Sequence, residues 1–385
     1  MNSFVFFLAL LRGLMSCCRV PVHVCPQMFR VLSLSVACVC VIAFAGSLPM
    51  NAAGPTPGPV SRASSSPDYL QINSLTTIAE CNGGGVLIED TVNGAWIISC
   101  PFTGIIRINS NGTRTWIASN DQCGGAYALA LNSKTGDLYA SCSRPKGPTI
   151  MTFHPDGSTT QLVQNFPGCT STSITYDPAR GLLYAACGSS MGVISVQTNS
   201  PYTITKIAGY PSCSSATGVA FDPSSPTGTV YASCYPGGLI AVDTAPLDQP
   251  KVLVSTAQCA YPKGITFNTF SGEILGTCLG SSANDTVVVS VMPSGQVMVL
   301  AVAGSGCTIP NMAVRDVGTG YVYVQCAGSI SVIREFGGPV IPITSPKQCM
   351  QSINHGLTLN QAQEVLYVTC AAGPSSTLQI TGLGV

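Results

Sequence analysis

Cysteine is the residue type whose spacing in this chain points most directly to chemistry. Fourteen of the 19 cysteines form seven pairs, whose members lie 18–21 residues apart and whose first members recur every 42–48 residues. The pairs are Cys81/Cys100, Cys123/Cys142, Cys169/Cys187, Cys213/Cys234, Cys259/Cys278, Cys307/Cys326 and Cys349/Cys370. A zinc site would need close ligand pairs such as CxxC or added histidines, whereas the sequence has no CxxC and, beyond residue 45, only His154 and His355. The spacing therefore predicts disulfides.

Two ways of pairing these cysteines are open. The first cysteine of each pair precedes one apolar strand and the second ends the next strand, so both lie at the same end of a hairpin. This placement favours one disulfide within each repeat. The alternative joins the second cysteine of one repeat to the first of the next, with Cys370–Cys81 closing the series.

The repeat itself predicts the architecture. A period in the forties that contains strand-like sequence is typical of a β-propeller blade. The strands that end at the second cysteines share a tyrosine three residues before it in five of seven repeats, namely Tyr139, Tyr184, Tyr231, Tyr323 and Tyr367. Because one face of each blade is buried, we expect these rings to pack between blades.

Each period contains sequence for four strands. A short apolar strand, such as Gly218–Asp222, usually ends in an Asp or Asn that favours a turn by bonding to the backbone two residues on; these residues are Asn132, Asp177, Asp222, Asn268 and Asn360. The last repeat ends after its third strand, whereas residues 69–72 occupy a fourth-strand position before the first cysteine. The fold class is therefore all-β: a seven-bladed β-propeller of residues 68–385, with four-stranded blades and a ring that the N-terminal strand closes by completing the last blade.

The order "GVAFDP…GTVYASC" and "GLTL…EVLYVTC" resembles the NHL and YVTN propeller repeats over residues 69–385. The resemblance implies the propeller fold. It does not define an activity, because unrelated functions share this fold. The cysteine pair in every blade departs from the general pattern of those repeats.

The N-terminus has the features of a secretory leader. Residues 1–45 contain an apolar segment after Arg30 and a small-x-small pattern at Ala43–Ala45, and Met28 is a second candidate start. We favour a cleaved signal peptide because the apolar core is short; the alternative is a signal anchor, in which uncharged residues 31–50 remain in the membrane. Residues 46–67 form a linker rich in Pro and Ser. Cleavage would also remove Cys17, Cys18, Cys25, Cys38 and Cys40.

Composition bears on partners and compartment. Charged residues are only 8% of the chain, with 16 basic and 16 acidic side chains and no basic run, so we expect no nucleic-acid partner. A leader with regularly paired cysteines predicts a secreted or cell-surface protein. The sequons at Asn111 and Asn284 are candidate N-glycosylation sites, which would make the chain a glycoprotein.

Candidate catalytic and metal-binding residues are few. His355 lies at the entry to an innermost strand and is the best-placed catalytic candidate, but no nucleophile or carboxylate partner accompanies it in the pattern. His154 lies in a turn between outer strands. Glu80, beside the first cysteine, is the metal candidate, and Glu89 and Asp90 follow in the same repeat. We expect Asp90 in a turn at the opposite end of its strand, which argues against joint metal binding.

For function, the sequence favours a non-catalytic scaffold that binds an extracellular protein or glycan through the face that bears the cysteines. The loops of that face are small, polar and mostly uncharged. No cofactor is predicted for such a scaffold, and a membrane is a partner only if residues 31–50 are retained. The alternative is a metal-dependent lactonase-like or lyase-like enzyme, as resemblance to gluconolactonase and strictosidine synthase propellers implies, with Ca²⁺ held in the central channel.

Overall fold

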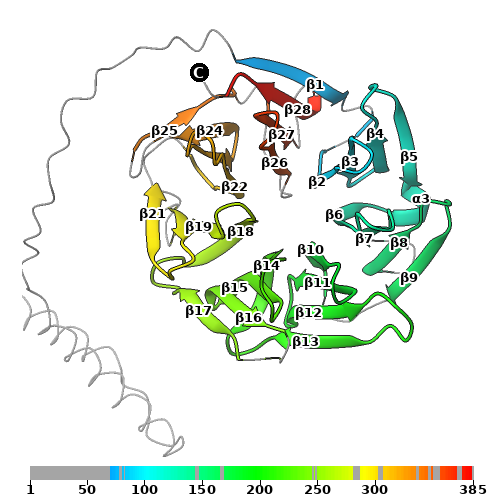
Figure 1. Ribbon diagram of the computed structural model, residues 1–385, viewed down its shortest axis with the longest axis horizontal. Helices are drawn as coiled ribbons and strands as arrows, with labels where there is room; N and C mark the ends of the chain where they lie inside the picture. Colours follow the sequence, from blue (N-terminus) through cyan, green and yellow to red (C-terminus); the bar gives the residue numbers. More distant parts are fainter. Residues whose placement is uncertain are drawn as a thin grey trace, which may run out of the picture. The chain divides into compact units, whose positions relative to one another are not determined.

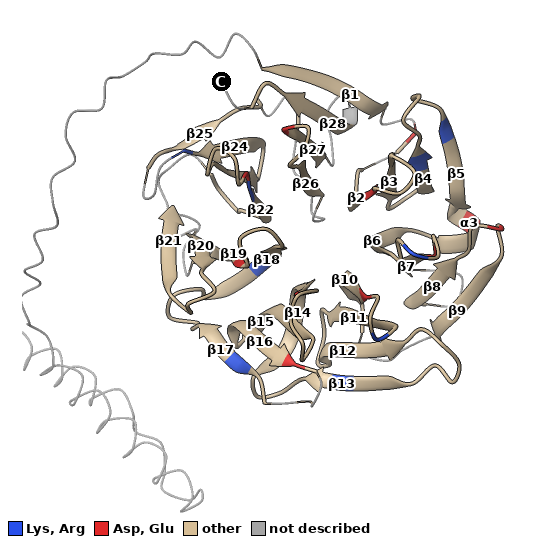
Figure 2. Ribbon diagram, in the orientation of Figure 1, with Lys and Arg blue, Asp and Glu red and all other residues tan. Residues whose placement is uncertain are grey.

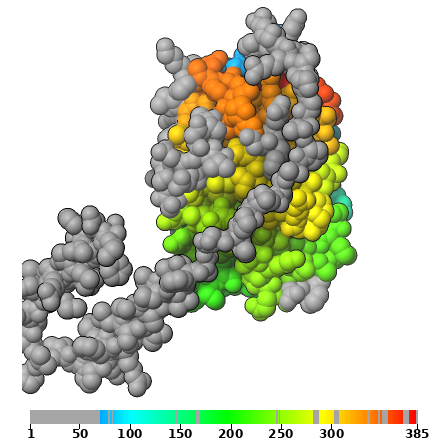
Figure 3. Space-filling view, turned by 90° about the vertical axis from the view of Figure 1, so that its left-hand side faces the viewer, coloured from blue at the N-terminus to red at the C-terminus, as the bar shows by residue number. Residues whose placement is uncertain are grey.

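The computed structural model describes one ring of seven four-stranded antiparallel sheets (Figure 1). The described residues are 70–77, 80–81, 83–143, 147–164, 169–244, 247, 249–280, 287–301, 307–334, 338–345, 348–349, 356–370 and 375–383. All belong to the compact unit Ser65–Val385. The ring is the seven-bladed β-propeller that the repeat predicted, and Figure 3, which views it from its edge, shows blades following one another in chain order along the rim.

The first two strands of each blade are its inner strands: the first lies beside the channel and the second lies next to it. The innermost strands are β2 (Leu87–Asp90), β6 (Ala126–Leu131), β10 (Ser171–Asp177), β14 (Cys213–Phe221), β18 (Tyr261–Asn268), β22 (Met312–Arg315) and β26 (Leu357–Asn360). The second strands are β3 (Ala95–Cys100), β7 (Leu138–Cys142), β11 (Leu182–Cys187), β15 (Thr229–Pro236), β19 (Glu273–Leu279), β23 (Val322–Cys326) and β27 (Val365–Thr369).

The outer two strands complete each blade. The third strands are β4 (Gly104–Ile108), β8 (Thr149–Phe153), β12 (Gly192–Gln197), β16 (Gly238–Asp243), β20 (Val287–Val291), β24 (Ser329–Ile333) and β28 (Ser375–Thr381). The outermost strands are β5 (Arg114–Ser119), β9 (Thr159–Gln164), β13 (Ile204–Ala208), β17 (Lys251–Val254), β21 (Val297–Ala301), β25 (Val340–Pro342) and β1 (Gln71–Thr77). Strand β1 pairs antiparallel with β28, so the N-terminal strand completes blade 7 and closes the ring, as predicted.

Every blade contains one disulfide, which joins its own two cysteines. The seven bonds are Cys81–Cys100, Cys123–Cys142, Cys169–Cys187, Cys213–Cys234, Cys259–Cys278, Cys307–Cys326 and Cys349–Cys370. The fourteen cysteines are at most 7% exposed. The intrablade pairing is confirmed. The bonds lie on one face of the ring, which we call the cysteine face, and the opposite face, which carries the Asp and Asn turns, is the turn face.

The shared tyrosines pack between blades, as expected. Tyr139 lies against Tyr176, Tyr184 against Phe221, and Tyr231 against Phe267, with ring centroids 4.9, 5.8 and 5.5 Å apart. In each contact the tyrosine comes from the second strand of one blade and its partner from the innermost strand of the next. At the junction where the ring closes, Tyr367 of blade 7 contacts Trp96 of blade 1, with centroids 3.7 Å apart.

Hydroxyl groups also link several of the innermost strands to the innermost strand of the next blade. Thr217 Oγ1 of blade 4 donates to Lys263 O of blade 5 at 2.8 Å, and Thr266 Oγ1 of blade 5 donates to Ala313 O of blade 6 at 2.7 Å. Thr358 Oγ1 of blade 7 donates to Leu87 O of blade 1 at 3.0 Å. Each bond satisfies a backbone carbonyl of the next blade, so polar side chains near the channel hold neighbouring blades together.

The turn face is built from side chain-to-backbone hydrogen bonds. Asp177 Oδ1 accepts from Ala179 N at 2.9 Å, and Asp222 Oδ1 accepts from Ser224 N at 2.8 Å. Asn268 Oδ1 accepts from Phe270 N at 3.0 Å in the same geometry. These are the turns that the sequence predicted from Asp and Asn. A residue with positive φ follows in the turn, such as Gly181 at +65°.

One element was not expected. Residues Asn120–Cys123 form a four-residue helix, α3, between β5 and β6. Gln122 Oε1 accepts from Ser119 N at 2.9 Å, which is half of a capping box. The part of the chain that the structure describes contains no helix with the length and apolar character needed to cross a bilayer.

Candidate functional site: the channel and the cysteine face

The central channel holds a cavity of about 280 Å³ between the innermost strands. Its lining is mainly aliphatic or small, with Leu129, Ile174, Val219, Ile265 and Met312 among its members. None of the described residues that line it is Asp, Glu, His, Lys or Arg. This lining therefore offers neither an acid–base group nor a charged metal ligand.

Three of the four hydroxyl groups in this lining, those of Ser173, Thr266 and Thr358, bond to the neighbouring blade. Thr266 and Thr358 donate to carbonyls of the next blade at 2.7 and 3.0 Å. Ser173 Oγ accepts from Val219 N at 3.3 Å. These groups hold neighbouring blades in register, so the polar atoms of the channel serve the fold.

A second cavity of about 270 Å³ lies at the turn-face mouth of the channel, between blades 5, 6 and 7. Phe267, Phe270, Met312 and Leu359 supply apolar surface, and Arg315 is the only Lys, Arg, Asp, Glu or His among the described lining residues. Whether this mouth is reactive therefore depends on what Arg315 contacts.

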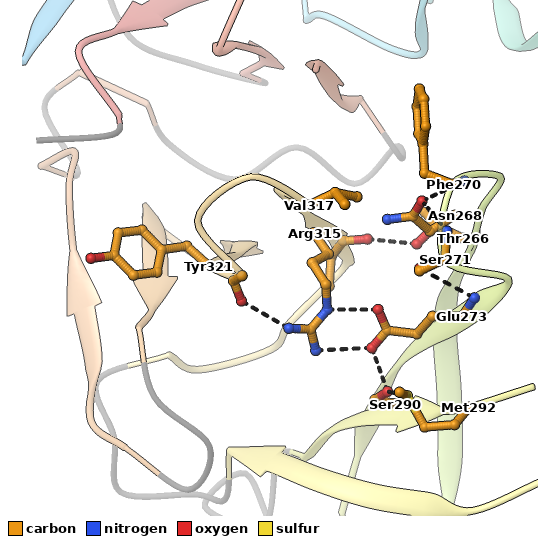
Figure 4. Close-up of polar contacts among 12 residues, drawn as sticks. Thr266, Asn268, Phe270, Ser271, Glu273, Ser290, Met292, Arg315, Val317 and Tyr321 are labelled. Atoms are coloured by element: carbon orange, nitrogen blue, oxygen red, sulfur yellow. Dashed lines mark hydrogen bonds and ion pairs between the residues drawn. The ribbon is translucent and has the colours of Figure 1, made fainter. Parts of the chain in front are cut away.

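Arg315 is fully engaged with the protein (Figure 4). Its Nε and Nη2 lie 2.6 and 2.9 Å from the two carboxylate oxygens of Glu273, whose side chain is 2% exposed. Ser290 donates to the same carboxylate, and Arg315 Nη1 donates to Gly320 O at 2.8 Å. The bidentate pair joins blade 5 to blade 6, and its charge is neutralised within the fold.

The acidic residues of the first repeat lie in separate places. Arg114 pairs with Glu80, whose Oε2 also accepts from Thr77 N at 2.9 Å. Burial acts to raise the pKa of Glu80, but the hydrogen bonds from Thr77 and the charge of Arg114 outweigh it and lower that pKa. Asp90 pairs with Arg107 on the turn face. Within the described ranges, no three His, Cys, Asp or Glu side chains gather closely enough to hold a metal ion.

Glu89 is the one carboxyl of this group with a raised pKa. Desolvation by burial raises it, and the hydrogen bond from Asn360 Nδ2, 2.8 Å from Glu89 Oε1, opposes the rise. This contact joins blade 1 to blade 7 and stabilises the closed ring.

The structure describes two of the remaining sequence candidates, His154 and Asn111. His154 lies on the turn face, where Nδ1 is 2.7 Å from Asp137 Oδ1 and Nε2 is 2.9 Å from Thr160 Oγ1. Asn111 lies in an exposed turn, where its Oδ1 accepts from Thr113 N at 2.9 Å. His355 and Asn284 lie outside the described residues.

Sequence reasoning missed an aromatic patch on the cysteine face. Tyr210, Tyr235 and Tyr261 are 80, 49 and 48% exposed, and Tyr235 stacks on Tyr261 with ring centroids 5.6 Å apart and planes 10° apart. A signal was present, because each of these residues precedes a proline and lies within three positions of a paired cysteine. Phe102 and Tyr127 add exposed rings elsewhere on this face.

Comparisons with known proteins confirm the fold alone. No protein-family model matches the chain, and no curated protein matches its sequence. Among solved structures, virginiamycin B lyase from Staphylococcus aureus is similar, with TM-score 0.63 and 12% identity over 81% of this chain and 99% of that chain. A streptogramin B lyase gives 0.62 and 12% over 81% and 97%, and Kuenenia stuttgartiensis hydrazine synthase gives 0.58 and 11% over 79% and 97%. The expected resemblance to NHL/YVTN-type propellers therefore holds at the level of the fold.

Proposed function

We propose that this chain is a non-catalytic extracellular scaffold, which binds a protein or glycan partner through its cysteine face. The observation that carries the proposal is the channel lining. In β-propeller enzymes of the kind considered above, acidic, amide or histidine side chains converge on the channel, whereas the described lining here is apolar, small or hydroxylated and includes Phe221 and Phe267. Three of its four hydroxyl groups, those of Ser173, Thr266 and Thr358, are occupied by contacts between blades.

The disulfides support an extracellular compartment. Seven buried bonds, one per blade, suit an oxidising environment outside the cytosol. The cysteine face presents exposed rings and few charges: its described loops and strand starts carry Glu80, Asp121 and Lys263, and the side chain of Lys206 also reaches it beside Gly209. Figure 2 shows how sparse charged residues are over the ring as a whole. Such a surface suits a partner recognised by hydrogen bonds and ring contacts.

The first experiment asks whether the central channel binds metal or supports turnover, as the enzyme alternative requires. We expect the purified protein, stripped of metal, to bind no Ca²⁺, Mg²⁺ or Zn²⁺ in calorimetric titration and to turn over no member of a lactone and ester panel. The channel-filling variant Thr175→Phe should leave partner binding unchanged. Stoichiometric metal binding, together with turnover that Thr175→Phe abolishes, would overturn the scaffold proposal.

The binding face is tested with two matched triple variants on a printed array of glycans and purified extracellular proteins. Phe102→Glu/Tyr127→Glu/Tyr210→Glu places charges on the cysteine face, and Val92→Glu/Phe270→Glu/Val317→Glu places them on exposed positions of the turn face. We expect the first variant to lose binding and the second to keep it. The reverse result would move the binding site to the turn face.

A further inference from the structure

Three exposed tyrosines lie at the cysteine-face ends of blades 4 and 5, and we call them the tyrosine platform: Tyr210, Tyr235 and Tyr261. Tyr235 follows Cys234 and is the last residue but one of β15, and Tyr261 begins β18 two residues after Cys259. The loop that carries Tyr210 lies against the turn after Tyr235, because a Cβ added to Gly237 would overlap Ser212 O. The loop residue Tyr210 and the strand residues Tyr235 and Tyr261 therefore lie on one part of the cysteine face.

The geometry of the two stacked rings limits what can bind them. With centroids 5.6 Å apart and planes 10° apart, Tyr235 and Tyr261 cover one face of each other. Pairs of aromatic rings already lie 4.5–7 Å apart when in contact, so no slot remains between these two for a proline or a third ring. Each ring is nonetheless about half exposed. The free surface is therefore a flat outer face with a hydroxyl at its edge.

The backbone beneath the platform is fixed before any partner arrives. The disulfide Cys213–Cys234 and the bond from Ser214 Oγ to Tyr235 O, 2.8 Å long, hold the segment that carries Tyr235. Cys213 N donates to Gly209 O at 2.8 Å next to Tyr210, and Cys259–Cys278 holds the start of β18. A rigid tyrosine surface loses little conformational entropy on binding.

The described charges near the platform are both positive. A Cβ added to Gly209 would overlap Nζ of Lys206, so this ammonium group lies beside Tyr210, and Lys263 lies two positions along β18 from Tyr261. Ser212 and Gln258 add uncharged polar groups nearby. The partner should therefore combine a flat apolar surface, a rim of hydroxyl groups and zero or negative charge.

Sugars have this combination of properties. The C–H face of a pyranose ring packs on a flat aromatic face, while its equatorial hydroxyls reach polar groups at the edge. We propose that the tyrosine platform binds glycans by ring stacking and prefers acidic glycans to neutral ones because of Lys206 and Lys263. This inference rests on the proposed scaffold function and gives it a site and a partner class.

The test measures binding of the purified, disulfide-intact protein to matched oligosaccharides that differ only in a glucose or a glucuronate. We expect Tyr261→Ala and Tyr235→Ala to weaken binding by about tenfold each, the effect of losing about 1.4 kcal/mol of aromatic contact. Tyr261→Phe should retain most binding because it keeps the ring. Tyr202→Ala, a 42% exposed tyrosine on the turn face, is the matched control and should change nothing.

Charge provides a second readout. The glucuronate ligand should bind several-fold tighter than the glucose ligand, and Lys206→Gln together with added salt should remove that difference. Thermal unfolding of each variant verifies that the ring is intact.

Each adverse result has its own meaning. Glycan binding that survives both alanine variants overturns the platform and leaves the scaffold function standing. Binding of proline-rich peptides or purified proteins without glycans, lost in the same variants, overturns the carbohydrate assignment alone. Absence of glycan binding overturns this inference, whereas metal-dependent turnover in the channel overturns the scaffold function itself.

Discussion

The two faces of the ring are stabilised by different chemistry. At the cysteine face, each blade is closed by a buried disulfide. At the turn face, the described ends of the blades are held by Asp and Asn turns and by the pairs Asp90–Arg107, Asp137–His154, Asp177–Arg180 and Glu273–Arg315. One end therefore depends on redox conditions and the other on charge.

This contrast bears on where a binding surface can form. On the turn face, polar side chains are used to satisfy the backbone and one another, so few are left for a partner. On the cysteine face, disulfides restrain the loops. The exposed side chains there are therefore not needed to hold the backbone and are available to contact a partner. The exposed rings of Tyr210, Tyr235 and Tyr261 are on that face.

Reduction of the disulfides should have the largest effect of the changes that test this contrast between the two faces. Each bond closes a loop of 18–21 residues and stabilises the fold by up to about 3 kcal/mol in the chain-entropy model. Seven such contributions rival the ~5–15 kcal/mol stability of a typical domain, so full reduction should unfold the ring near physiological temperature. Denaturant melts of oxidised and reduced protein, with thiol counting, measure this.

A single pair gives a finer version of that test. Cys259→Ala/Cys278→Ala should lower the free energy of unfolding by about 2–3 kcal/mol. Asp222→Asn, which keeps the turn-forming side chain on the other face, should leave it nearly unchanged. A fully reduced protein that melts at the same denaturant concentration as the oxidised one would show that the disulfides do not stabilise the cysteine face.

The next largest effect should come from Glu273→Gln on the turn face. Breaking a buried ion pair costs about 3–5 kcal/mol, and we expect about 2–3 kcal/mol here because Arg315 is partly exposed. Urea denaturation measures the loss. Glu273→Leu/Arg315→Leu should recover part of it, since neither charge is then left alone. A loss below 0.5 kcal/mol, roughly the level of an exposed pair, would contradict the structural role of this contact.

High pH should weaken the contacts that the shared tyrosines make between blades. Burial, with the nearby carboxylates of Asp222 and Asp243, raises the pKa of Tyr231 to about 12, and burial also raises the pKa values of Tyr184 and Tyr367. Because the pKa of Tyr231 is raised in the folded state, the packing of its neutral ring contributes fully to the free energy of unfolding below the usual value of 10. That contribution is lost as pH rises through about 12. Unfolding monitored by phenolate absorbance should show this fall in stability at high pH. In Tyr231→Phe the free energy of unfolding should fall less as pH rises. Tyrosines that titrate without unfolding would contradict this packing.

Much of this fold could be predicted from the sequence because the evidence for it is local and repeated. Cysteine spacing, Asp and Asn at strand ends, and the unpaired strand at residues 69–72 predicted the blade number and the ring closure and favoured the intrablade disulfides over the interblade alternative. The site was harder to predict because it depends on contacts between distant residues. Thr369 donates to Gly85 O across 284 positions, and the stacking of Tyr235 on Tyr261 requires knowledge of how neighbouring blades approach.

Glu80 illustrates the same limit and gives the smallest expected effect. Its role as a metal candidate came from its place beside Cys81, and nothing local in the sequence indicated that Arg114 would reach it. Because the pair is partly exposed, Glu80→Gln should lower the free energy of unfolding by only about 0.5 kcal/mol, and added salt should remove the difference. The lowered pKa means that this contribution is present above 4.5 and is lost as pH falls through the folded-state value. Asp121→Asn, an exposed acid on the same face, is the control. A loss as large as that of Glu273→Gln would mean that charge stabilises both faces equally, and the contrast between them would then fail.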